Sequence, residues 1–117
     1  MNEIISKELL SEVLGVMVLG VGNIINNKLN YTTKHRDFDE VAYKDINIYE
    51  LAHKCKEWAW KVHKKIISSE VSVDNWVSIV AHFYGNLNVK VEETFSAETE
   101  PEAVFRACEW ILEGEVI

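Results

Sequence analysis

Proline, cysteine and arginine are scarce in this chain, and long apolar runs are missing. One proline and 48% apolar residues among 117 are typical of a folded domain, because a disordered chain lacks the apolar surface that offsets its entropy. No apolar run approaches the about 20 residues that span a bilayer. The first residues carry Glu3 where a secretory signal carries lysine or arginine. We therefore expect a single cytoplasmic domain over residues 1–117.

The cysteines and histidines do not show the spacing of a metal site. Cys55 and Cys108 each lie in a helical apolar pattern, so we expect small buried hydrophobic residues rather than a disulfide or zinc ligands. His53 and His63 are ten residues apart on one expected helix. The sequence thus predicts neither a metal nor a cofactor.

Catalytic motifs are also missing: the chain has no Gly-x-Ser-x-Gly, no phosphate-binding glycine loop and no His-Glu-x-x-His. The adjacent glutamates Glu92 and Glu93 point to opposite faces of an expected strand, which prevents them from acting as an acid and base pair. We expect a binding protein and not an enzyme.

Negative charge is concentrated in the second half of the chain. Residues 1–67 hold ten basic and nine acidic side chains, whereas residues 68–117 hold two and ten. This distribution disfavours general nucleic-acid binding, which depends on lysines and arginines that contact phosphates. A small anionic ligand remains compatible, since it needs only a local basic pocket.

The patterning predicts an α+β fold in the order helix, hairpin, helix, hairpin, helix. Apolar spacing predicts a helix over 3–14, and β-branched residues predict a hairpin over 16–33 with its turn at Asn26-Asn27. A further short strand within 34–44 is hinted at by Phe38, Val41 and Tyr43. Asn47 and Glu50 form a capping-box pattern at the start of a helix expected over 48–67. Its expected buried stripe ends with Val62 and Ile66.

The second half repeats the alternation of strands and helix. Strands over 76–84 and 87–95 flank Gly85-Asn86, a dipeptide suited to a tight turn. Alternation places Val77, Ile79, Ala81 and Phe83 on one face, with Trp76, Ser78, His82 and Tyr84 opposite. A final helix should begin after Thr99 and end at Gly114. We expect these elements to form a layered sandwich of two antiparallel hairpins with three helices.

Arg106 and the lysines of the middle helix are the candidate anion contacts. Arg106 lies beside Phe105 and one turn before Trp110, and a guanidinium next to aromatic rings suits a phosphate or a nucleobase. It could equally be a surface arginine paired with Glu102 or Glu109. Lys54 and Lys56 could contact phosphate or simply form part of a solvated helix face.

Aromatic residues outside the expected core stripes are the second candidate feature. Trp60, Trp76, His82 and Tyr84 require a covering surface if they are exposed. A partner subunit, a flat ring ligand or the N-terminal helix of the same chain could cover them. Phe83 and Tyr84 are candidates for base stacking on their chemistry alone.

Three segments resemble a family of small bacteriophage proteins. They are LLSEVLG at 9–15, INIYELAHKCKEWA at 46–59 and TEPEAVFRACEWIL at 99–112, about a third of the chain in all. Together they resemble the phage anti-Thoeris sponge proteins of the first type. The resemblance implies homo-oligomers in the host cytoplasm that bind glycocyclic ADP-ribose, and in some members cyclic oligonucleotides, and sequester this immune signal without cleaving it. Within the matched segments, Arg106, Lys54 and Lys56 suit the phosphates.

Two other functions remain open. The acidic half could mimic nucleic acid and block a basic site on a host defence protein. Alternatively, carboxylates brought together by folding could form a metal-dependent nucleotide hydrolase. A mimic should present its acids as one continuous stripe, whereas a sponge should place Arg106 or the lysines in a concave pocket.

Overall fold

The computed structural model describes residues 4–34, 40–86 and 88–115. Its elements are α1 (Lys7–Leu14), β1 (Val18–Ile25), β2 (Lys28–Lys34), β3 (Val41–Asn47), α2 (Ile48–His63), β4 (Lys65–Val71), β5 (Trp76–Gly85), β6 (Asn88–Ala97) and α3 (Glu100–Glu115). They form two three-stranded antiparallel sheets, β1-β2-β3 and β4-β5-β6. The expected α+β class and order of helices and strands are confirmed, and each hairpin gains a third strand. The first helix is shorter than the expected 3–14: it begins at Lys7, because the Ser6 side chain caps it by accepting a hydrogen bond from the Leu9 amide.

The first sheet is built around the expected turn at Asn26-Asn27. Both asparagines adopt positive φ, 54° and 63°, which matches the turn that continues the right-handed strand twist. β3 then pairs with β2 without a register shift, from Lys28 opposite Asn47 to Lys34 opposite Val41. The hinted strand within 34–44 is therefore a strand over Val41–Asn47, while Phe38 lies outside the described residues.

Helix α2 begins as predicted but ends earlier. The Asn47 side chain accepts hydrogen bonds from the backbone amides of Tyr49 and Glu50, at 2.9 and 3.3 Å. The helix ends at His63 because Lys64 adopts the left-handed conformation, with φ 57°, and the β-branched residues that follow pair with β5. The expected helix over 48–67 was thus too long. Val62 and Ile66, expected in its buried stripe, are exposed.

In the second sheet, the face that packs on the helices is not the more apolar one. Ser78 and Val80 of β5 are fully buried and Phe95 of β6 packs on the core, whereas Val89 and Val91 are exposed. The face with Val77, Ile79, Ala81 and Phe83 therefore points away from the helices. Trp76, Ser78 and His82 were expected outside the core, and this expectation was wrong because their face packs on the helices. Tyr84, the fourth residue of that set, is exposed.

Helix α3 begins at the expected cap, where Thr99 Oγ1 accepts a hydrogen bond from the Glu102 amide at 3.4 Å. It continues through Gly114 to Glu115, so Gly114 does not end it. Phe105 is fully buried with the stripe that includes Val104 and Cys108. Phe105 therefore belongs to the core and does not flank the exposed Arg106.

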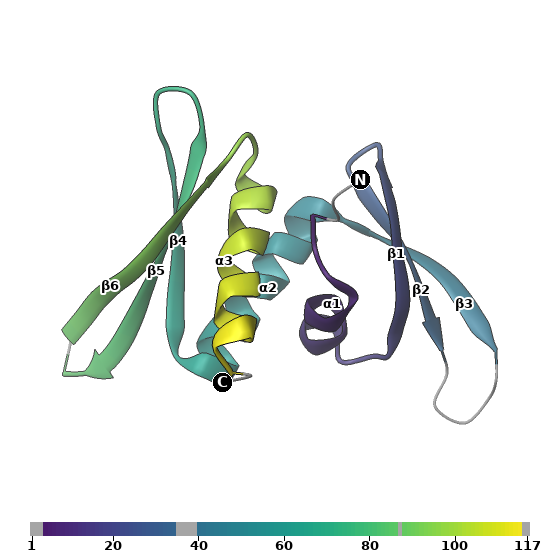
Figure 1. The fold of residues 1–117 in the computed structure, drawn as a ribbon, viewed down its shortest axis with the longest axis horizontal. Helices are drawn as coiled ribbons and strands as arrows, with labels where there is room; N and C mark the ends of the chain where they lie inside the picture. The colour runs from purple at the N-terminus through teal and green to yellow at the C-terminus, as the bar shows by residue number, and fades with distance from the viewer. Residues whose placement is uncertain (1–3, 35–39, 87, 116–117) are drawn as a thin grey trace.

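Helices α2 and α3 lie between the two sheets, and α1 packs on the side of the β1-β2-β3 sheet (Figure 1). One core joins all these layers and includes Leu10 of α1, Leu29 of β2, Leu51 of α2, Val80 of β5 and Phe105 of α3. None of the helices in the described ranges is long and apolar enough to cross a membrane. The residue that caps α1 also contacts α3, because Ser6 Oγ donates to Glu109 Oε1 at 2.7 Å.

Candidate functional site

A cleft of about 470 Å³ lies along α3 beside β6, and it brings together two of the residues singled out in the sequence, Arg106 and Trp110. The Trp110 ring packs against Phe95 of β6, with ring centroids 6.0 Å apart and planes tilted by 53°. The other lining residues are Ile4, Glu102, Glu109 and Glu113. Sequence reasoning did not single out Phe95, because only strand pairing places it next to α3.

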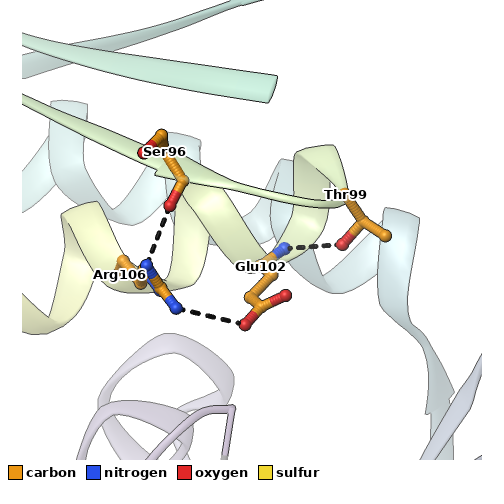
Figure 2. Close-up of polar contacts among 4 residues, drawn as sticks. All are labelled: Ser96, Thr99, Glu102 and Arg106. Atoms are coloured by element: carbon orange, nitrogen blue, oxygen red, sulfur yellow. Dashed lines mark hydrogen bonds and ion pairs between the residues drawn. The ribbon is translucent and has the colours of Figure 1, made fainter. Parts of the chain in front are cut away.

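Arg106 is held in one direction by neighbours on two elements (Figure 2). Its Nη1 donates to the Ser96 carbonyl at 2.8 Å, and its Nη2 lies 3.5 Å from Glu102 Oε1, one helical turn earlier. Its side chain is 56% exposed. The pairing with Glu102 that the sequence left open is present. Because a guanidinium has five N–H donors, donors remain for a ligand in the cleft.

Among the described residues that line the cleft, three are glutamates and one, Arg106, is a cation. Glu102 pairs with Arg106, and Glu109 accepts hydrogen bonds from the Ser6 hydroxyl and amide. Glu113 has no polar partner among the residues that the structure describes. An anion bound here therefore depends on direct contact with Arg106, since the surrounding field is negative.

The remaining expected contacts do not converge on this cleft. Lys56 forms an ion pair with Glu100 at 3.5 Å across the α2–α3 interface, and Lys54 is exposed on α2. Phe83 packs on Trp60, with centroids 5.6 Å apart, whereas Tyr84 points to the other face of β5 and packs on His82. The structure thus brings Arg106 and Trp110 together and leaves the other four elsewhere.

A hollow of about 700 Å³ between the α1–β1 turn and the β2–β3 pair has the opposite charge. Lys34 and Lys44 line it together with Val16, Met17 and Thr33, and lysine is the one charged residue type among its described lining residues. Sequence reasoning missed this hollow. Lys44 reaches it only because β3 pairs in register with β2, which places Lys44 opposite Tyr31.

A third hollow, of about 720 Å³, runs between α1 and α3 and is acidic. Glu8 and Glu12 of α1 face Glu109 and Glu113 of α3 across it. The last two glutamates also line the Arg106 cleft. These carboxylates therefore form a continuous acidic surface over the two helices.

The two thiols meet inside the core, where both are free and buried as expected. Cys108 Sγ lies 3.6 Å from the Cys55 carbonyl oxygen. Hydrogen bonding to Cys108, together with burial, raises the pKa of the Cys55 thiol well above its ordinary value. Neither thiol lines any of the hollows described above. Among the described residues, no three His, Cys, Asp or Glu side chains are grouped to hold a metal ion.

No protein-family model matches the chain, and no curated protein or solved structure matches it either.

Proposed function

We propose that this chain binds a small nucleotide-type signal and sequesters it without cleaving it. The observation that carries the proposal is the meeting of Arg106 with Trp110 and Phe95 in one cleft. A fixed guanidinium suits a diphosphate, and the two rings offer an apolar surface for a base or ribose. The resemblance to the phage anti-Thoeris sponge proteins supplies the ligand class, glycocyclic ADP-ribose, and the setting, the cytoplasm of an infected host.

The experiment that tests sequestration is recovery of the ligand. The protein is incubated with glycocyclic ADP-ribose, separated from free ligand and denatured, and the released compound is identified by mass spectrometry. We expect stoichiometric recovery of the intact compound. Recovery of a cleaved product would identify a hydrolase instead, and no retained ligand would reject binding of this signal.

A second function, an acidic inhibitor of a host defence protein, is favoured by the continuous surface of Glu8, Glu12, Glu109 and Glu113. Such a surface suits a basic site that normally contacts nucleic acid. The double change Glu8→Gln and Glu12→Gln removes two charges that lie outside the Arg106 cleft. If the protein is a mimic, this variant should lose protection of phage in cells while ligand binding is unchanged. If it is a sponge, protection should survive.

A further inference from the structure

The outer face of the β4-β5-β6 sheet is defined by the residues whose side chains point away from α2 and α3. Cross-strand partners share a face, so the register Ile66–Ala81–Val91 and Phe83–Val89 groups these residues together. The opposite face is marked by Ile67 and Val80, which belong to the core. The outer face comprises Lys64, Ile66, Ser68 and Glu70, Val77, Ile79, Ala81 and Phe83 of β5, and Val89, Val91, Thr94 and Ser96 of β6.

The centre of this face is apolar, and none of the described helices covers it. Its central column on β5, Val77 to Phe83, is apolar at every outward position. Val89 and Val91 beside it are 51% and 59% exposed, and Trp60, 41% exposed, extends the surface from Phe83. Helices α2 and α3 lie on the other side of the sheet (Figure 1). In the central column Val77, Ile79 and Phe83 are half-buried, and Ala81 is buried between Ile66 and Val91. A contiguous apolar surface with exposed flanks of this kind marks a protein interface.

The two charged residues of the outer face lie at its opposite ends, so the face is complementary in charge to a second copy of itself. Lys64 stands at the Phe83 end, where its carbonyl accepts from the Phe83 amide at 3.3 Å, and Glu70 stands at the other end, opposite Val77. The six residue steps from Lys64 to Glu70 span about 20 Å of strand. Lys64 Nζ lies 5.1 Å from the Trp60 ring centroid, so its charge borders the apolar surface. One positive and one negative end give the face no net charge to attract a strongly basic or acidic partner.

We propose that a second copy of this chain packs its outer face against this one, with the strands of the two sheets antiparallel. A two-fold axis in the interface, perpendicular to the strands, brings Lys64 of each copy to Glu70 of the other. The same rotation places Val77 against Phe83 and Ile79 against Ala81, so the apolar columns match along their length. Two twisted sheets pack in this way about 10 Å apart. The interface stands on this sheet alone and does not depend on the ligand proposed above.

Sedimentation equilibrium of the full chain in the micromolar range tests the interface. The wild type should show about twice the monomer mass of 13.5 kDa. Val91→Lys places a charge in the apolar surface at a position already exposed, so it should give a folded monomer by circular dichroism. A monomeric wild type, or a folded Val91→Lys dimer, would overturn the proposal.

Charge reversal tests the orientation of the two copies. Lys64→Glu and Glu70→Lys should each raise the dimer dissociation constant about fivefold or more, because each change breaks two symmetry-related pairs. The double variant should return to the wild-type value, and Lys28→Glu on the other sheet is the matched control. A double variant no tighter than the single ones would overturn the antiparallel arrangement. Ligand binding is measured separately on each variant. A protein that does not bind the ligand would therefore reject the proposed function without changing the conclusion on the dimer.

Discussion

Arg106 shows how a residue's role depends on contacts that its sequence position does not reveal. Its position beside Phe105 indicated an aromatic neighbour, yet Phe105 is buried and the ring pair that shares its cleft is Trp110 with Phe95. Its guanidinium is held by Ser96 and Glu102. The side chain is therefore directed before any ligand binds, which reduces the entropy lost on binding.

Arg106→Ala should weaken binding of glycocyclic ADP-ribose by about ten- to a hundredfold, because charge-assisted hydrogen bonds contribute about 1.5–3 kcal/mol. Arg106→Lys should restore only part of the affinity, since an ammonium lacks the planar fork. Calorimetry measures both variants, with Lys28→Ala as a control outside the cleft. Unchanged affinity in a folded Arg106→Ala would remove Arg106 from the site. The hollow with Lys34 and Lys44 would then be tested by Lys44→Ala.

The buried thiols should be unreactive in the native protein. The raised pKa of Cys55 keeps it protonated at neutral pH, and its burial excludes reagents. Because the pKa is higher in the folded than in the unfolded chain, the stabilising contribution of this thiol is present below the unfolded value of about 9 and is lost as pH rises through the folded value. Reaction with a disulfide reagent should be slow at pH 8 and rapid after denaturation. Rapid labelling of the native protein would contradict this account.

At the scale of elements, local signals predicted the starts of α2 and α3 and the first turn better than the ends of these two helices. Asn47, Thr99 and the Asn26-Asn27 turn act locally through their side chains or backbone conformation, and all three are where the sequence placed them. The end of α2 is different. The residues that follow His63 have apolar spacing that also fits a helix, and they form a strand because β5 is available to pair with them.

The Asn26-Asn27 turn supplies a stability test. Asn27 has φ 63°, a conformation that costs a residue with a β-carbon roughly 1–2 kcal/mol and glycine little. Asn27→Gly should therefore raise the free energy of unfolding, and Asn27→Ala should lower it. Urea denaturation measures both, with Asn23→Ala in β1 as a control at negative φ. If Asn27→Gly and Asn27→Ala change the free energy of unfolding equally, the positive φ of Asn27 does not determine the stability of this turn.

At the scale of the whole molecule, the chain uses the order of three strands and a helix twice, as β1-β2-β3-α2 and β4-β5-β6-α3. The repeats do not form separate cores. Val18 and Leu29 of the first sheet belong to the same buried cluster as Val80 of the second, with α2 and α3 packed between them. The α1 helix closes this cluster through Leu9 and Leu10.

A shared core predicts cooperative unfolding. Calorimetry should record one transition whose calorimetric and van't Hoff enthalpies agree, because neither repeat retains its packing when the other opens. Leu51→Ala in α2 should lower the transition temperature while keeping a single transition, since a buried leucine contributes about 2–5 kcal/mol. Two resolved transitions would show that the sheets unfold independently.

The sequence by itself determined the class of fold, the starts of α2 and α3 and the turn of the first hairpin, since caps, turn residues and apolar periodicity act over a few neighbouring residues. It could not determine which face of β5 is buried, because both faces carry apolar residues and only the position of α3 decides between Val80 and Ile79. It also could not place Phe95 beside Arg106 or Lys44 in its hollow. Those neighbours come from strand register and helix packing, which join residues that no local pattern connects.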